Sequence, residues 1–240
     1  MRRLHVPELH PGRLTADTAQ AHHLTTVLRL SAGDAVEAFD SAGRTAVATI
    51  ESTSPLVVLN VDAVEESVAA GGIVVAAAVP KGDRAEWMIE KLSELGVGRY
   101  VPLRTARSVV HPEGRNKIER WERIAIESAK QCRRPGVMAI EPLTPVSAFL
   151  ATLDPASSYY FSTHPASRPF VSLFAGRRTA TLLVGPEGDW TPDEEAAFAE
   201  RGLTAAGLGR TILRVETAAV LAAGLATQFA DAALHSDRNP

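Results

Sequence analysis

The sequence predicts a two-domain α/β protein, in which a small β-rich domain over residues 1–70 precedes a mostly parallel α/β domain over residues 71–240. Short runs that alternate or cluster in the manner of β-strands fill the first part. A continuous apolar run of strand length, 73–79, opens a second part in which strand-like and helix-like segments alternate. Between the two parts, residues 65–72 (EESVAAGG) have no clear period and end in a glycine pair, which is typical of a linker.

The first domain is expected to contain three strands and one helix. The turn sequence Asp40-Ser41-Ala42-Gly43 separates two strand-like runs and predicts a β-hairpin. Residues 15–28 have the apolar spacing of a helix that interrupts the strands. The expected strands are 34–39, 45–50 and 56–61.

Helix starts in the second domain are predicted by the spacing of a capping box, in which a polar N-cap residue precedes a glutamate by three positions. Asp83 with Glu86 predicts a helix that ends at Gly96, and Asn116 with Glu119 predicts a second, longer helix. The remaining expected elements are strands at 99–103, 137–140, 159–161 and 180–184 and an alanine-rich helix at 218–234.

Composition and cysteine usage exclude several protein classes. The chain has 240 residues, of which 45% are hydrophobic and 22% charged, which is ordinary for a globular protein. Its most apolar window, 72–79, is far too short to span a membrane, and the N-terminus lacks the apolar stretch of a secretory signal. We therefore expect a cytoplasmic protein. Cys132 is the only cysteine, and the histidines lack metal-ligand spacing, so neither a disulfide nor a metal is expected.

The formal net charge of −3 conceals an uneven distribution of charge. Basic residues outnumber acidic ones between residues 104 and 134, whereas the first domain is acidic. Such a patch suits a polyanionic partner such as RNA. The patch alone is better explained as a solvated helix face, because Glu119, Glu122 and Glu127 are interleaved with the basic residues and can pair with them along the helix.

A glycine-bearing loop, Gly185-Pro186-Glu187-Gly188, follows the strand expected at 180–184 and precedes the helix-start signal at 191–194. Ligands of open α/β sheets bind beyond the carboxyl ends of the strands, and glycine lets a ligand approach the backbone closely. The chain contains neither G-x-x-x-x-G-K-S/T nor G-x-G-x-x-G, so a nucleotide-phosphate loop is not expected. A second such segment, 209–217, follows a short apolar stretch at 203–208.

These two loops resemble the signature of the SPOUT class of RNA methyltransferases, and within it the ribosomal small-subunit RNA uridine-N3 methyltransferases. The similarity covers nearly the whole chain, from His23-Leu24 and Val27-Leu28-Arg29, which resemble the family's PUA-like barrel, to the C-terminal segments. Asp189 and Val215 depart from the pattern, because the family usually has glycine and threonine there. The other motifs are Lys81-Gly82-Asp83-Arg84, Arg107-Ser108, Arg133-Arg134, Leu208-Gly209, Ile212-Leu213-Arg214 and Glu216-Thr217-Ala218.

The resemblance implies that a PUA-like RNA-binding barrel precedes a trefoil-knotted α/β methyltransferase domain. It implies S-adenosylmethionine as the cofactor, N3 of a specific uridine in the 16S rRNA of the small ribosomal subunit as the acceptor, and a homodimer that the last helix helps to form. Two alternatives remain open. One is a related knotted methyltransferase acting on a tRNA ribose or guanine, and the other is a non-catalytic RNA-binding factor of ribosome assembly.

By the same resemblance, the cofactor would lie among the loops at 162–165, 183–188 and 208–213. Small residues, aliphatic side chains and free backbone groups suit an adenine ring and its hydrogen-bonding edges. The expected cofactor-binding residues are Thr163, Leu183, Val184, Gly185, Pro186, Glu187, Gly188, Leu208, Gly209, Ile212, Leu213 and Thr217.

Arg214 is the expected catalytic residue, because a fixed guanidinium would stabilise the negative charge that develops on the uracil oxygens as N3 loses its proton. A structural ion pair is the alternative role for this side chain. Glu216 is a candidate proton acceptor, although we favour a helix-capping role for it. The expected phosphate contacts to RNA are Arg29, Arg107, Arg133 and Arg134.

Overall fold

The computed structural model describes residues 1–66, 72–112 and 114–238, which form two compact units. Unit 1 comprises Met1–Ala70 with Ile126–Val137, and unit 2 comprises Gly71–Ala125 with Met138–Pro240. A boundary at residue 70 alone would not place Ile126–Val137 in unit 1. This segment includes the end of the long helix α3 (Arg115–Cys132). Most of the expected linker, residues 67–71, lies outside the described residues.

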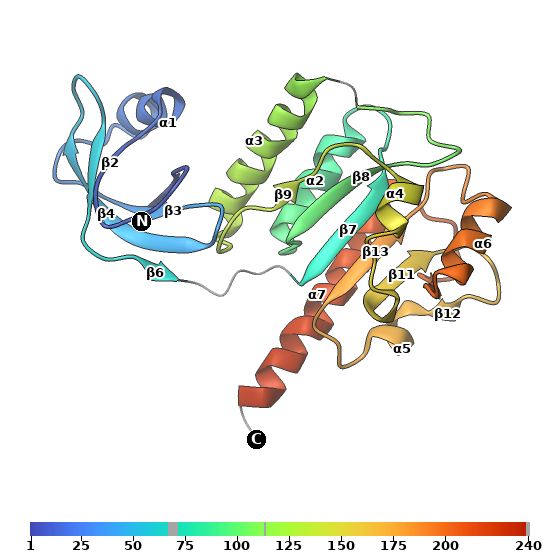
Figure 1. Ribbon diagram of the computed structural model, residues 1–240. Coiled ribbons are helices and arrows are strands. Elements are labelled where there is room, and N and C mark those ends of the chain that lie inside the picture. Colours follow the sequence, from blue (N-terminus) through green and yellow to red (C-terminus); the bar gives the residue numbers. More distant parts are fainter. Residues whose placement is uncertain (67–71, 113, 239–240) are drawn as a thin grey trace. The chain divides into compact units, whose positions relative to one another are not determined.

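Unit 1 contains a six-stranded sheet with the strand order β1-β3-β4-β5-β2, and β6 pairs with β4 (Figure 1). The three strands expected from the sequence are confirmed as β3, β4 and β5. The strands β1 and β2 were not expected, because each is only four residues long and shows too few apolar positions for a period. The bounds are β1 (Arg2–His5), β2 (Gly12–Thr15), β3 (Ala35–Phe39), β4 (Arg44–Ser52), β5 (Val58–Val61) and β6 (Glu65–Glu66).

The helix expected at 15–28 is shorter than predicted and changes type along its length. An α-helical turn, α1 (Thr18–His22), continues directly into a π-helical turn, η1 (His23–Val27). Leu24 of η1 is fully buried in the core of unit 1, whose central members also include Leu4, Val36 and Leu59. The helical spacing of the sequence therefore reported the buried face correctly but not the helix start.

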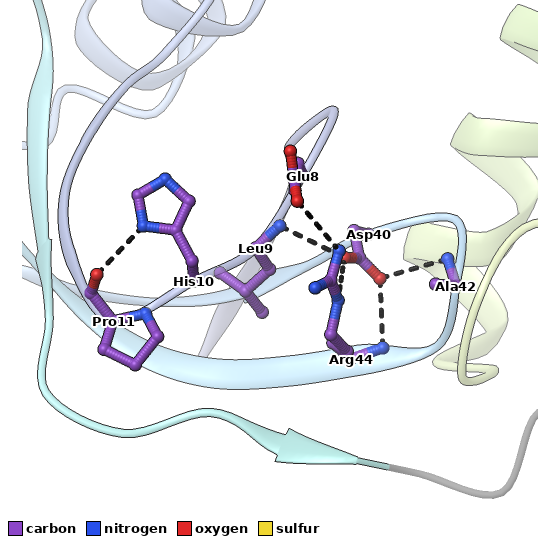
Figure 2. A network of polar contacts seen from close by, with 7 residues as sticks. All are labelled: Glu8, Leu9, His10, Pro11, Asp40, Ala42 and Arg44. Carbon is purple, nitrogen blue, oxygen red and sulfur yellow. Dashed lines mark hydrogen bonds and ion pairs between the residues drawn. The ribbon is translucent and has the colours of Figure 1, made fainter.

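Asp40 connects the N-terminal segment of unit 1 to the β3–β4 hairpin (Figure 2). Its side chain is 1% exposed. One carboxylate oxygen accepts hydrogen bonds from the backbone N–H groups of Ala42 (3.0 Å) and Arg44 (3.0 Å). The other accepts from the backbone N–H of Leu9 (3.1 Å) and from Nε of Arg44 (2.6 Å). Burial by itself would raise the pKa of Asp40, but the hydrogen bonds and the charge of Arg44 outweigh it and lower the pKa below its usual value.

We expect Asp40→Asn to lower the free energy of unfolding of unit 1 by about 1–2 kcal/mol at neutral pH, because an amide N–H₂ would face donors that now meet a carboxylate oxygen. A lowered native pKa means that the ionised form stabilises the fold above the unfolded-state pKa, and that this stabilisation is lost as the pH falls through the native pKa. The difference from wild type should therefore shrink between about pH 7 and about pH 3 in urea unfolding.

The exposed Asp62, whose side chain accepts a hydrogen bond from the amide of Asn60, supplies the matched control Asp62→Asn. This variant should unfold like wild type at both pH values, because a solvated carboxylate contributes little. An Asp40→Asn deficit that is the same size at both pH values would contradict the assignment of the stabilising charge to Asp40.

Unit 2 is built on an eight-stranded sheet with the order β10-β8-β7-β13-β11-β14-β12, in which β9 also pairs with β8 (Figure 1). Every pairing in this sheet is parallel. The strands are β7 (Ile73–Ala78), β8 (Arg99–Arg104), β9 (Ala139–Ile140), β10 (Thr144–Pro145), β11 (Ser158–Phe161), β12 (Arg168–Pro169), β13 (Ala180–Val184) and β14 (Thr204–Gly207). The helices are α2 (Arg84–Glu94), α3, α4 (Val146–Leu150), the 3-10 helix η2 (Pro155–Ser157), α5 (Phe170–Phe174), α6 (Pro192–Glu200) and α7 (Val215–Arg238).

Both faces of this sheet are covered. A cluster of buried side chains, which includes Phe149 of α4, Leu183 of β13 and Phe198 of α6, fills one side. On the other side α7 contacts β7, β13 and α2 (Figure 1). At Gly224 of α7 a Cβ atom would lie 3.8 Å from a side-chain carbon of Leu95, which is an ordinary contact, so the packing of α7 does not require glycine there. Loops follow the strands at the edge of the sheet where the strands end.

Of the capping boxes that the sequence predicts, neither Asp83 with Glu86 nor Asn116 with Glu119 is formed. Asp83 is the N-cap of α2 but makes no side-chain capping bond. Glu86 instead pairs with Arg120 at 2.7 Å. Helix α3 begins at Arg115, so Asn116 is already helical, and Glu119 pairs with Arg115 at 2.7 Å. Both glutamates therefore pair with a guanidinium and not with the backbone of a helix start.

Candidate functional site

Three neighbouring strands of unit 2 end at one edge of the sheet. In the parallel order β13-β11-β14, Phe161 is in register with Val184 on one side and with Ala206 on the other. The segments that follow these strands, 162–165, 185–190 and 208–213, therefore leave the sheet side by side. The structure brings together the three loops in which the family resemblance places the cofactor.

These loops enclose a cavity of about 290 Å³. Most of the expected cofactor-binding residues line it: Thr163, Val184, Gly185, Pro186, Glu187, Gly188, Leu208, Gly209, Ile212 and Leu213. Leu183 does not, because alternate residues of a strand face opposite sides and Leu183 points into the apolar cluster against α4 and α6. Thr217 also does not, because it lies exposed in the first turn of α7.

Further residues line this cavity without having been singled out from the sequence. Three of them lie inside the loops expected to hold the cofactor, three lie one or two residues beyond those loops, and one belongs to the first turn of α7. The additional lining residues are Phe161, Ser162, Asp189, Arg210, Thr211, Val215 and Ala218.

The 185–190 loop is held in place by the buried ring of Trp190 and by the start of α6. The indole of Trp190 is buried and donates from Nε1 to the backbone carbonyl of Phe161 at 2.9 Å. A Cβ atom at Gly185 would lie only 3.0 Å from the Trp190 ring, so this position has no room for a side chain. At the end of the loop, the expected capping box between Thr191 and Glu194 is confirmed at the start of α6.

Asp189 links two of the three loops across the cavity. Its Oδ2 accepts a hydrogen bond from the hydroxyl of Thr163 at 2.7 Å. Its backbone N–H donates to the carbonyl of Pro186 at 2.9 Å, which closes a turn, and its φ of 61° lies in the left-handed region. Asp is one of the residues that tolerates this conformation, although glycine adopts it with less strain.

A second depression, of about 520 Å³, borders the first. Its wall is formed by Lys81, Arg84, Arg107, Val109, Glu187, Gly188 and Arg214. Glu187 and Gly188 belong to both walls. The expected catalytic residue Arg214 is exposed, and its neighbours Leu213 and Val215 line the first cavity. Arg214 therefore lies at the boundary between the two hollows.

Glu216 does not cap α7. It is 5% exposed, and one carboxylate oxygen pairs with Nη1 of Arg84 at 3.4 Å. The other oxygen is buried and has no hydrogen-bond partner within the described part of the chain. Glu216 thus pairs with Arg84 and not with Arg214, and it lines neither hollow.

The expected RNA contacts are placed differently from one another. Arg107 is exposed, but its Nη1 already donates to the backbone carbonyls of Gly188 (2.7 Å) and Trp190 (3.0 Å), so it also supports the 185–190 loop. In unit 1, Arg29 and Arg133 are exposed. Arg134 is only 7% exposed, which removes its guanidinium from the surface, so the expected direct phosphate contact by Arg134 has to be corrected.

Two family models match separate parts of the chain. A model of the RNA methyltransferase domain matches residues 69–227, and a model of the RNA methyltransferase PUA domain matches residues 16–59. The ribosomal RNA small subunit methyltransferase E of Bacillus subtilis is 30% identical over 217 residues, which cover 85% of this chain and 85% of the relative. The chain belongs to the ribosomal RNA small subunit methyltransferase E family. The Synechocystis member is 31% identical over 217 residues, covering 87% of this chain and 71% of its own.

A solved structure from the ribosomal RNA small subunit methyltransferase E family has the same fold. The Neisseria gonorrhoeae enzyme, bound to S-adenosyl methionine, is 27% identical with a TM-score of 0.82, and the match covers 95% of this chain and 97% of that one. The resemblance stated from the sequence is therefore confirmed, as is the combination of a PUA-like N-terminal domain with a parallel-sheet methyltransferase domain.

The residues that the structure describes contain no group of three or more His, Cys, Asp or Glu side chains placed to hold a metal ion. No helix among them is both long and apolar enough to cross a bilayer.

Proposed function

We propose that this protein transfers the methyl group of S-adenosylmethionine to N3 of a specific uridine in the 16S rRNA of the small ribosomal subunit. The observation that carries the proposal is the pair of adjoining hollows with a common wall at Glu187 and Gly188. One hollow offers loop backbone and aliphatic side chains, and the other offers lysine and arginine side chains. A cofactor and an anionic RNA therefore find suitable surfaces next to each other.

The first cavity fits the cofactor chemically. Its size is near the lower end of small-molecule sites, which measure roughly 300–1,000 Å³. Within the described chain, the backbone groups of residues 209–212 form no hydrogen bond with another residue and are free for the edges of an adenine ring. The carboxylates of Glu187 and Asp189 suit a cationic ligand. Bound there, S-adenosylmethionine would supply an activated methyl group on a sulfonium centre.

The residues of the second hollow suit the acceptor. We assign to Arg214 the stabilisation of negative charge on the uracil oxygens as N3 loses its proton. We assign the role of proton acceptor to Glu187, because among the described residues it is the carboxylate that reaches both hollows. Glu216 is excluded from this role, since it is buried against Arg84 and reaches neither hollow.

The proposal includes three further features of the family resemblance: a trefoil knot in unit 2, a cytoplasmic location beside ribosomal particles, and a homodimer. Exposed apolar side chains on the adjacent helices α2 and α7, Trp87 (46%) and Leu221 (38%), support a face that a second copy covers. Light scattering of the full chain tests this, and a single-chain mass would contradict it.

The decisive experiment is methyl transfer from labelled S-adenosylmethionine to small ribosomal subunits that lack the modification, followed by mass mapping of the RNA. We expect label on the uracil base at N3. Label on a ribose or a guanine would favour the related methyltransferase alternative. Binding of subunits without any transfer would favour the assembly-factor alternative, which the retained cofactor cavity and Arg214 disfavour.

A further inference from the structure

The depression beside the cofactor cavity collects cations from three separate connections of unit 2. Lys81 and Arg84 lie where β7 leads into α2, Arg107 follows β8, and Arg214 precedes α7. These connections follow β7, β8 and β14, which belong to the parallel series β8-β7-β13-β11-β14 and therefore end at the same edge of the sheet. Like charges repel, so gathering them in one hollow has a cost that an anionic ligand would offset.

Within the described residues, three of these cations have no acidic partner, since Arg107 donates only to backbone carbonyls. Among the described residues, the side chains of Lys81 and Arg214 form no hydrogen bond or ion pair. Val109 is 66% exposed at the same hollow, so solvent reaches it. Glu187 is the acidic member of this wall, and it lies on the side shared with the cofactor cavity. The remainder of the wall is therefore positive.

Arg84 is positioned by a buried carboxylate. Its Nη1 meets Glu216 at 3.4 Å, and its Nε donates to the backbone carbonyl of Lys81 at 3.3 Å. The Arg84 side chain remains 37% exposed, whereas Glu216 is buried with one oxygen that has no hydrogen-bond partner in the described chain. Burying a carboxylate with an incomplete set of partners is unfavourable for stability. A role in holding Arg84 at the hollow would explain why a buried carboxylate stands at position 216 despite this cost.

From these contacts we infer that the depression binds a backbone phosphate of the substrate RNA next to the target nucleotide, with Lys81 and Arg84 as the phosphate ligands and Glu216 as a positioning residue. The inference rests on the proposed function. Arginine presents a fork of donors that matches phosphate oxygens, and lysine adds a point charge. A phosphate held here would direct the attached base across the wall of Glu187 and Gly188 toward the cofactor cavity.

The test compares Lys81→Ala and Arg84→Ala with Arg168→Ala in the full-length protein. Arg168 is an exposed arginine of the edge strand β12 that lines neither hollow, and so serves as a matched control. Phosphate contacts position RNA without reading its sequence. We expect each of the first two variants to raise KM for unmodified small subunits roughly 3- to 10-fold and to reduce the salt dependence of RNA binding by about one contact. The Kd for S-adenosylmethionine, measured by calorimetry, should stay unchanged.

Glu216→Gln tests positioning. If the carboxylate acts through Arg84, this variant should raise KM in the same direction while kcat and the cofactor Kd remain near wild type. An additional effect of Glu216→Gln in the Arg84→Ala background would overturn this role, because the two residues would then act independently.

A short RNA hairpin containing the target uridine, with a neutral methylphosphonate at one flanking position at a time, locates the phosphate. At one position, the methylphosphonate should weaken RNA binding by the wild-type protein. At that same position it should cause no further loss of binding by Lys81→Ala. An equal loss in both proteins at every position would overturn the inference. Failure of wild type to methylate any RNA would refute the proposed function, whereas the phosphate assignment would still stand or fall by these binding measurements.

Discussion

Replacing Arg214 by alanine is expected to lower kcat for methyl transfer by roughly 100- to 1,000-fold, which is the scale for removing one preorganised donor to a developing oxyanion. Arg214 lies at the boundary of the two hollows and is exposed, so its loss removes charge from the acceptor side without opening the core. The Kd for S-adenosylmethionine should change by less than about threefold, because Leu213 and Val215 rather than Arg214 line the cofactor cavity.

Two further variants separate charge from geometry. Arg214→Lys keeps the charge but loses the planar fork of donors, so we expect it to recover only part of the rate. Arg210→Ala removes an arginine from the same segment that lines the cofactor cavity instead of the depression, and its kcat should stay near wild type. Single-turnover rates on unmodified subunits measure all three variants.

The pH dependence distinguishes catalysis from support of the loop. If Arg214 stabilises the uracil anion, raising the pH should partly restore the rate of Arg214→Ala, because more of the base then ionises without help. A variant that loses cofactor affinity and transfer rate together, at every pH, would instead show that Arg214 orders the 208–213 segment.

Most of the sheet of unit 2 was predictable because buried parallel strands are continuous apolar runs. This holds for β7, β8, β11 and β13, which were expected within one or two residues. The short edge strands β10 and β12 were not expected, since each has two residues and contains a proline. Two residues cannot show a period, and such strands are fixed by the neighbours with which they pair.

The cofactor side of the candidate site was largely predictable because it consists of loops at strand ends, and such loops are contiguous in sequence. The acceptor side was not, because its wall combines residues from four separate segments, which only the strand order brings together: Lys81, Arg84, Arg107, Val109, Glu187, Gly188 and Arg214. Lys81 and Arg84 were visible as a motif, but nothing local in the sequence connects them to Arg214.

The roles of individual side chains were harder to predict than the strands or the loops. Arg134 has the same residue type as its exposed neighbour Arg133, yet Arg134 is buried. Burial lowers the pKa of the Arg134 guanidinium, which fits a side chain removed from solvent. Glu216 similarly had the position of a capping residue, but the distant Arg84 captured its carboxylate. Long-range partners decide such cases, and local spacing does not report them.

The link between Asp189 and Thr163 leads to a prediction about cofactor affinity. Asp189 combines a left-handed backbone with a carboxylate that reaches across the cavity to the Thr163 hydroxyl at 2.7 Å. Asparagine tolerates the same backbone and can still accept this hydrogen bond, whereas glycine keeps only the backbone and alanine keeps neither. Three substitutions at one position therefore separate backbone conformation from the side-chain link.

We expect the affinity for S-adenosylmethionine to fall in the order Asp, Asn, Gly, Ala at position 189, with Asp189→Ala weakened roughly 30- to 150-fold. That range combines about 1–2 kcal/mol for a left-handed alanine with about 1 kcal/mol for the lost hydrogen bond. Isothermal titration calorimetry with the full-length protein measures the Kd of each variant.

A double-mutant cycle isolates the link itself. Thr163→Val should weaken cofactor binding a few-fold in wild type and have no further effect in the Asp189→Gly background, because the partner is already absent. Thr211→Val is the matched control, since Thr211 lines the same cavity and its hydroxyl has no partner among the described residues. If Thr163→Val and Asp189→Gly prove additive, the two side chains bind the cofactor separately, and the hydrogen bond between them does not organise the cavity.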